Sequence, residues 1–214
     1  MSSSEITKNL KLKDYSKYLL AMLAPKEHRN HLLAIFGLYT ELSQVPLEVS
    51  EPMVGLIKLQ WWRDVFAEIK EGKPPRPHPI LLALKNENIQ FDKIEKIINA
   101  FQDFTENGSP KTIAELETFL NNTEVVILNY AAEVIGAQLN QHQAMAYALA
   151  NVSAKISRYK KFELTAEQLA NKSQELLNSS KSVLYIITKH LIKFGENRRY
   201  SLLLKLALHS SSLF

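Results

Sequence analysis

Apolar residues recur at intervals of three and four along nearly the whole chain, and this spacing constrains the fold more than any other feature. The interval matches the 3.6-residue turn of an α-helix, so it gathers apolar side chains on one helix face. No segment alternates apolar and polar residues with period two, and no Asn-Gly or Asp-Gly pair separates two such segments as in a hairpin. The sequence therefore predicts an all-α protein.

Prolines and polar caps mark the expected helix ends. Pro25 suits the first turn of a helix that Pro46 ends near residue 45, and its apolar segment at 32–38 predicts a central, buried helix. Ser50 is the expected cap of the next helix, which runs to about Glu71. Further helices are expected over 79–85, 91–104, 112–136, 141–158, 165–178, 181–194 and 197–208.

The chain length suits one domain. The 214 residues are 46% hydrophobic, which is ample for a core. The loops GKPPRPHP and ENGSP are too short to be linkers, and no internal repeat is visible. We therefore expect residues 1–214 to form a single helical domain, with residues 1–12 disordered.

Several function classes lack their required residues. The chain has no cysteine, which excludes disulfides, thiolate metal sites and cysteine nucleophiles. It also has no G-x-x-x-x-G-K, G-x-G-x-x-G or G-x-S-x-G motif, so nucleotide-binding and serine-hydrolase chemistry have no support. No apolar run approaches the ~20 residues that span a bilayer, and the first residues lack the order of a secretory signal. We therefore expect a cytoplasmic protein.

The positive charge is concentrated near the C-terminus. The net charge is +4, but residues 141–214 contain 11 Lys and Arg against 4 Asp and Glu. Basic clusters stand at 158–161 and 198–200. This excess predicts weak peripheral contact with an anionic membrane surface. No nucleic-acid recognition motif accompanies it, so we expect no nucleic-acid partner.

Metal-binding patterns are weak. The four aspartates are nowhere three or four residues apart, so no helix offers a paired-aspartate face for magnesium. Asp64 and Glu68 have a helical spacing but are expected to form a solvated edge. His28 and His31 have a zinc-ligand spacing, yet no third ligand follows. We therefore assign no metal ligand, no cofactor and no catalytic residue.

Four segments, taken in order, resemble the squalene/phytoene synthase family. Together they cover about two-thirds of the chain. They are Leu23-Ala24-Pro25 with Arg29 and LLAIFGLYTEL at 32–42, GLIKLQWWRDVFAEI at 55–69, His78-Pro79 with LLAL at 81–84, and TIAELETFLNNTEVVILNYAAEVIGA at 112–137. Within the family, ELSQVPLEVSEPMVGLIKLQWW is nearer to the branch of the mitochondrial complex I assembly factors.

The resemblance implies an isoprenoid-synthase helical bundle, here C-terminally shortened. Active members join two prenyl diphosphates, with magnesium held between two facing aspartate-rich helices. This chain has Ser43, Gln44 and Leu47 where the first aspartate motif would lie, and these are the candidate ligand-binding positions. The region of the second motif, after Leu149, has no acid before Glu163. Both aspartate motifs that would hold magnesium are missing. We therefore predict that this chain has lost the catalytic activity of the family.

Three functions remain open at this point. The leading hypothesis is a non-catalytic scaffold that binds a protein partner or an apolar isoprenoid-like ligand, in the assembly of a respiratory complex. The alternative is a prenyltransferase that condenses isoprenoid diphosphates with unfamiliar residues. The third is a lipid or membrane-surface binder.

Overall fold

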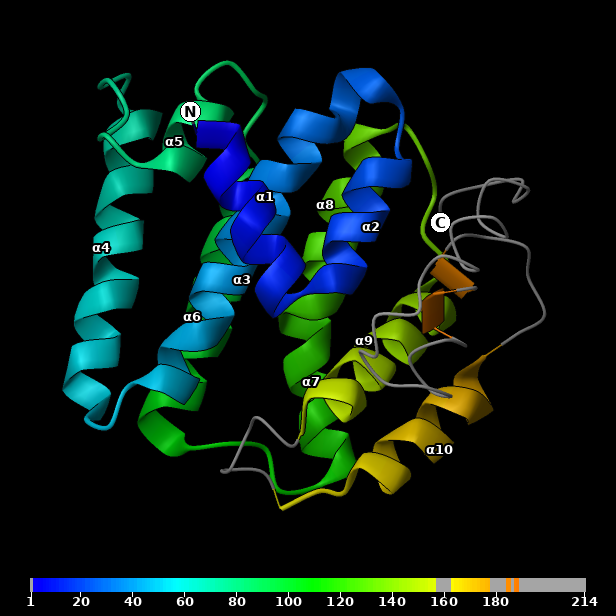
Figure 1. Cartoon of the computed structure of the whole chain (residues 1–214). Coiled ribbons are helices and arrows are strands. Elements are labelled where there is room, and N and C mark those ends of the chain that lie inside the picture. The colour runs from blue at the N-terminus through cyan, green and yellow to red at the C-terminus, as the bar shows by residue number, and fades with distance from the viewer. Residues whose placement is uncertain (1, 157–162, 178–183, 186, 189–214) are drawn as a thin grey trace.

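The described part of the chain is helical throughout. The computed structural model describes residues 2–156, 163–177, 184–185 and 187–188, and no strand occurs among them (Figure 1). The helices are α1 (Ser2–Lys13), α2 (Tyr15–Leu23), the 3-10 turn η1 (Lys26–His28), α3 (Arg29–Glu48), α4 (Pro52–Lys70), α5 (Pro79–Leu84), α6 (Phe91–Asn107), α7 (Ile113–Asn122), α8 (Glu124–Val134), α9 (Gln141–Lys155) and α10 (Ala166–Leu176). The all-α prediction is confirmed.

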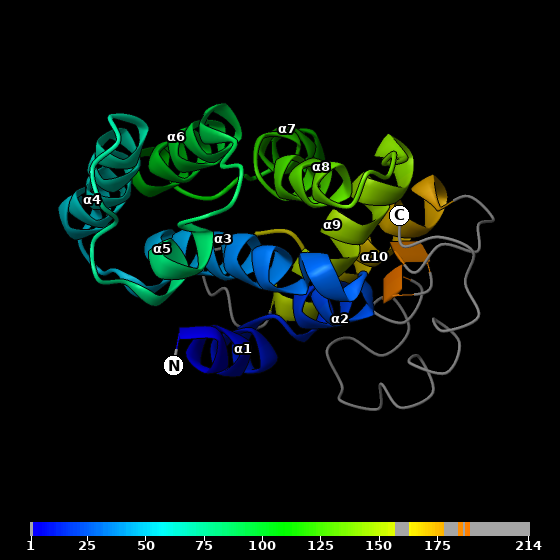
Figure 2. The same cartoon turned by 90° about the horizontal axis from the view of Figure 1, so that it is seen from above.

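Helix α3 forms the centre of the bundle. It packs against α1, α2, α5, α6 and α8, and Figure 2 shows it between α1 on one side and α6 and α8 on the other. Leu33 and Phe36 are 5% and 0% exposed, so the predicted burial of this helix is confirmed. Helices α9 and α10 pack against each other at one end of the bundle.

The prediction that residues 1–12 are disordered is wrong. Residues 2–12 form most of α1, in which Ile6 and Leu10 are 4% and 0% exposed. These two side chains are four residues apart and therefore share one helix face, and α1 packs against α3 and α5. A Cβ atom at Gly37 of α3 would lie 2.8 Å from Ile6 Cγ2, so the missing side chain lets the helices approach closely.

Two expected boundaries near α3 also differ. Pro46 does not end α3, which continues to Glu48. A proline removes one backbone N–H donor from a helix. Because Pro46 lies in the last turn, this loss affects only the end of α3. Ser50 does not cap α4, because the residue before the helix is Glu51, without a side-chain cap, and Pro52 occupies the first position.

The long helix expected over 112–136 is divided into α7 and α8. Thr123 lies between them with φ −129° and ψ −87°, outside the helical region. Its hydroxyl donates to the Phe119 carbonyl at 2.9 Å, which satisfies the end of α7. As a result Glu124 begins a new helix.

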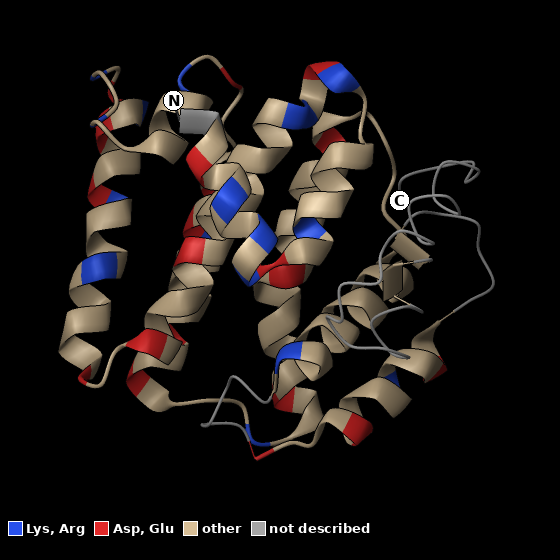
Figure 3. Cartoon of the chain, in the orientation of Figure 1, with Lys and Arg blue, Asp and Glu red and all other residues tan. Residues whose placement is uncertain are grey.

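The chain after residue 156 is described in part. The basic clusters at 158–161 and 198–200 and the helix expected over 197–208 lie outside the described residues. Of the helix expected over 181–194, residues 184–185 and 187–188 are described and are helical. Both signs of charge are interspersed over the described helices (Figure 3). None of these helices is both long enough and apolar enough to cross a bilayer.

Candidate functional site

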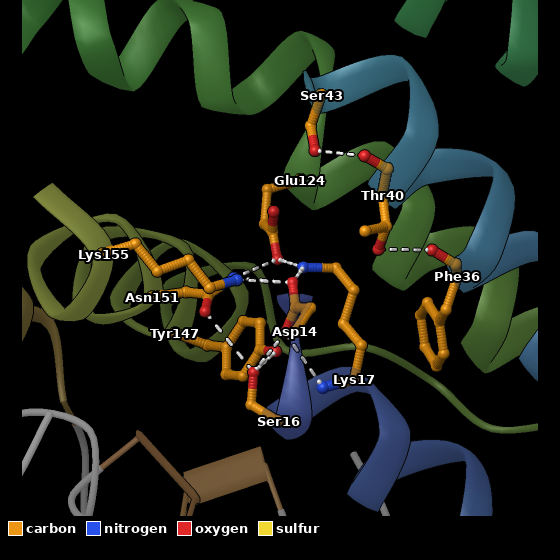
Figure 4. A network of polar contacts seen from close by, with 10 residues as sticks. All are labelled: Asp14, Ser16, Lys17, Phe36, Thr40, Ser43, Glu124, Tyr147, Asn151 and Lys155. Carbon is orange, nitrogen blue, oxygen red and sulfur yellow. Dashed lines mark hydrogen bonds and ion pairs between the residues drawn. The ribbon is translucent and has the colours of Figure 1, made fainter. Parts of the chain in front are cut away.

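Four charged side chains and one amide side chain are buried where α2, α8 and α9 meet, and we call this group the buried ion cluster (Figure 4). Each member is at most 5% exposed. The members are Asp14, Lys17, Glu124, Asn151 and Lys155. Charged groups are rarely buried unless they are paired, so this cluster is the strongest departure from an ordinary apolar core.

Local helix structure positions each member. Asp14 is the N-cap of α2 and accepts a hydrogen bond from the Lys17 backbone N–H at 3.2 Å, which places Lys17 one turn away. Glu124 is the first residue of α8, where the positive end of the helix dipole favours a carboxylate. Asn151 and Lys155 are four residues apart on α9 and so project from one face.

The ion pairs within the cluster are short. Lys17 Nζ lies 2.7 Å from Asp14 Oδ2 and 2.5 Å from Glu124 Oε1. Lys155 Nζ lies 2.6 Å from the same Asp14 oxygen. The Asn151 amide donates to Glu124 Oε1 at 3.2 Å. Two ammonium groups thus compensate two carboxylates, and the four ionic groups carry no net charge.

Neighbouring polar groups complete the coordination of the cluster. Ser16 Oγ donates to Asp14 Oδ1 at 2.8 Å and also lies 2.8 Å from the Tyr147 hydroxyl. The Lys17 ammonium lies 4.6 Å from the centre of the Tyr39 ring, in cation–π contact. Burial would raise the pKa of Asp14, but the Lys155 and Lys17 ammonium groups hold this pKa well below its usual range. Asp14 is therefore ionised at neutral pH.

The three predicted site positions are divided between two cavities. Ser43 and Leu47 line a cavity of about 50 Å³ that also reaches the buried ion cluster. The Ser43 hydroxyl donates to the Thr40 carbonyl at 2.9 Å, so it is already bonded within α3. Gln44 instead lines a groove between α3 and α4. A ligand-binding role for these residues stays a prediction.

The magnesium that the family resemblance implies does not fit this arrangement. Magnesium requires near-octahedral oxygen ligation, whereas Lys17 and Lys155 contribute ammonium groups, which cannot ligate it. Both carboxylates of the buried ion cluster are already bound by these ammonium groups. No group of three or more His, Asp or Glu side chains suited to a metal occurs in the described part of the chain.

The weaker metal patterns are also engaged by other partners. Asp64 accepts a hydrogen bond from Gln60, and Glu68 forms an ion pair with Arg76 at 2.7 Å. The Glu68 and Arg76 side chains are about one-third exposed, as expected for a solvated edge. His31 contacts Glu87 and the Tyr130 hydroxyl. Each of these side chains thus has a structural role.

The cavity beside the buried ion cluster is too small for an isoprenoid substrate. Sites for small organic ligands usually enclose about 300–1,000 Å³, compared with about 50 Å³ here. Aromatic rings fill part of this region, where Phe101 and Phe119 are 5.6 Å apart between ring centres. Among the described residues, this space can hold a water molecule but not a prenyl diphosphate.

Reasoning from the sequence missed the buried ion cluster. Asn151 and Lys155 are four residues apart and lie in the region of the expected second motif. A search for pairs of acidic residues does not find them, because neither is an acid. Asp14 followed three residues later by Lys17 also resembles a helix cap, which was a usable signal. No local signal joins Glu124 to either pair, because 107 residues separate it from Lys17.

Comparisons with known proteins give one family. The chain is 32% identical to human NADH dehydrogenase (ubiquinone) complex I, assembly factor 6 over 130 residues, which cover 59% of this chain and 39% of that protein. The Bos taurus protein of the same name is 31% identical over 130 residues, with the same coverage. The match thus spans about two-fifths of the length of these relatives. No solved structure matches the chain. The family pattern of squalene/phytoene synthase matches residues 10–182, and the chain therefore belongs to the squalene/phytoene synthase family.

Proposed function

We propose that this chain is a non-catalytic member of its family that binds a protein partner and assists the assembly of respiratory complex I. The observation that carries the loss of catalysis is the buried ion cluster. Its lysines occupy the space between the carboxylates Asp14 and Glu124, where a metal-dependent enzyme would need free oxygen ligands.

The energetics support a structural role for these charges. A diphosphate leaving group needs strong charge stabilisation in the transition state, which bound metal ions commonly supply. Lys17 and Lys155 are 0% and 5% exposed and are paired with carboxylates, so neither ammonium is presented to a substrate phosphate. The buried ion cluster therefore stabilises the bundle and performs no chemistry.

The assembly role is supported by similarity. The curated relatives carry the name complex I, assembly factor 6, and about 60% of this chain aligns with them. An assembly factor acts by binding proteins, so the partner of this chain is a protein. Peripheral contact with an anionic membrane belongs to the same proposal and is supported by the basic excess after residue 140.

The assembly role is tested by removing the gene from its own cells. Assembled complex I is then measured on native gels, with another respiratory complex as the internal control. We expect complex I to fall while the control complex is unchanged, and the wild-type gene to restore it. A normal level of complex I without the gene contradicts the role.

The loss of catalysis is tested separately. Purified protein is incubated with magnesium and radiolabelled farnesyl or geranylgeranyl diphosphate, beside an active family member as positive control. We expect no coupled product from this chain. Any magnesium-dependent product overturns the non-catalytic proposal and restores the prenyltransferase alternative.

A further inference from the structure

A groove of about 490 Å³ runs between α3 and α4. It lies on the face of α3 opposite to the residues that line the cavity beside the buried ion cluster. It is separate from the buried ion cluster, since the two cavities share no lining residue. Its lining includes Glu41 and Glu48 of α3 and Ile57, Lys58 and Trp61 of α4, together with His78. We call it the α3–α4 groove.

Helix α4 exposes apolar side chains in and beside the groove. Ile57 lines the groove and is 63% exposed. Met53 and Val54 lie outside the groove lining and are 66% and 45% exposed, and all three residues lie in the first half of α4. Helix α4 is at the edge of the bundle, where it packs against α6 and α3 (Figures 1 and 2). Ile57 and Trp61 are four residues apart and line the groove. Clustered exposed apolar residues are typical of interaction sites.

The α3 side of the groove carries an incompletely compensated carboxyl group. Burial raises the pKa of Glu41 to about 7; Lys13 opposes this effect and Glu5 adds to it. Glu41 Oε2 lies 3.5 Å from His78 Nε2, but burial lowers the pKa of His78, so its imidazole is neutral at pH 7. Lys13 is bound to Glu48 at 3.0 Å. With a pKa of about 7, Glu41 is about half ionised at neutral pH, and a cation bound beside it would favour the carboxylate form. Lys58 also lines the groove, so the incoming cation has to bind at Glu41 itself.

An aromatic wall continues from this carboxyl group. The His78 ring lies 5.1 Å from the Trp62 ring and 5.7 Å from the Trp61 ring, between ring centres. Trp62 is only 5% exposed, so His78 and the half-buried Trp61 form the accessible part of this wall. The Arg76 guanidinium already lies 5.7 Å from the centre of the Trp61 ring, in cation–π contact. A further guanidinium group would therefore bind at the Glu41 carboxyl group, through paired hydrogen bonds.

We propose that the α3–α4 groove binds a helical segment of a protein partner, which packs apolar side chains against Ile57 and Trp61 and places an arginine against Glu41. An amphipathic helix in an apolar groove is a common recognition mode. The charge complementarity at Glu41 selects a basic residue within that helix. The inference rests on the proposed function only in taking the partner to be a protein.

The probe is a set of capped, fluorescein-labelled 16-residue helical peptides. Each carries leucines at helical spacing and one arginine, whose position is moved through one turn across the set. A second set replaces arginine with citrulline, which has the same shape but no charge. Binding to the purified full chain is measured by fluorescence anisotropy. We expect the best arginine peptide to bind about tenfold more tightly than its citrulline counterpart, as for one charge-assisted hydrogen bond.

Three variants locate the binding. E41Q should bring the arginine peptide to the affinity of the citrulline peptide, and I57K should abolish binding of both. L82K is the matched control, because Leu82 is also exposed, at 49%, but does not line the groove. Circular dichroism melts confirm that each variant is folded. The proposal is overturned if no arginine peptide exceeds its citrulline counterpart, if E41Q has no effect, or if L82K weakens binding as much as I57K.

The same variants separate this inference from the proposed function. If the peptides bind as expected but gene removal leaves complex I unchanged, the groove stands and the assembly role fails. If gene removal lowers complex I and I57K restores it as fully as the wild type, the assembly role stands and the α3–α4 groove is not its docking site.

Discussion

Replacing Lys17 with methionine tests the energetic reasoning for the buried ion cluster. Lys17 is fully buried and binds both Asp14 and Glu124. After the substitution, Asp14 keeps Lys155 at 2.6 Å, whereas Glu124 keeps the neutral amide of Asn151 at 3.2 Å. The variant therefore leaves one uncompensated negative charge in the core, and Glu124 is its site.

The expected loss follows from the Glu124 carboxylate, which is left without an ammonium partner. Breaking a buried ion pair by removing one partner typically costs about 3–5 kcal/mol, because it leaves an uncompensated charge in the interior. We therefore expect K17M to lower the free energy of unfolding at pH 7 by about 3–4 kcal/mol.

Urea unfolding followed by tryptophan fluorescence measures these differences. The double variant K17M/E124Q should recover about 2 kcal/mol relative to K17M alone, since it removes the unpaired charge. K13M is the matched control, because Lys13 pairs with Glu48 at the surface, where the two side chains are 43% and 51% exposed. It should cost at most about 1 kcal/mol. The reasoning is refuted if K17M loses less than about 1 kcal/mol at pH 7, or if E124Q gives no recovery.

Three further predictions concern other parts of the fold. Changing Ser43, Gln44 and Leu47 to aspartate should destabilise the protein by several kcal/mol in a thermal melt without producing prenyl transfer, because two of the new carboxylates would adjoin the buried ion cluster. The pKa of Glu41 is raised to about 7, so its contribution to stability falls as the pH rises from 4.5 to 7; E41Q should flatten this dependence in urea titrations, by about 1 kcal/mol after allowance for the partly exposed side chain. Tyr130 is fully buried and its hydroxyl binds a backbone carbonyl at 3.0 Å and a backbone N–H at 3.2 Å in the segment before α6, so Y130F should cost about 1–3 kcal/mol in the same assay.

The sequence predicted the helices whose formation and burial depend on their own residues. The apolar segment at 32–38 indicated a buried helix because its side chains are apolar on every side, and α3 is that helix. Residues 1–12 were expected to be disordered because their many polar residues conceal Ile6 and Leu10, whose burial depends on α3 and α5. The break at Thr123 likewise depends on the surroundings, since it places Glu124 against Lys17.

The candidate site was less predictable than the fold. Ser43 and Leu47 line the cavity beside the buried ion cluster, and their ligand-binding role stays a prediction. The carboxylates of this cluster are bound by Lys17 and Lys155. Sequence rules place lysine at the surface, since an isolated buried ammonium is costly. A buried lysine requires carboxylates from helices that are distant in the sequence, and no pattern within one helix reveals these partners.

The buried ion cluster also has a consequence for biosynthesis. Its contacts between the start of α2 and the helices α8 and α9 join residues that are 107 to 141 positions apart, from Lys17–Glu124 to Asp14–Lys155. Contacts of such long range form late and slow folding. While the ribosome has not yet released α9, Asp14 and Lys17 have no complete set of partners and stay hydrated, which keeps α2 from docking. The N-terminal helices thus have to wait for the last part of the cluster, and during that interval their apolar faces are open to chaperones and proteases.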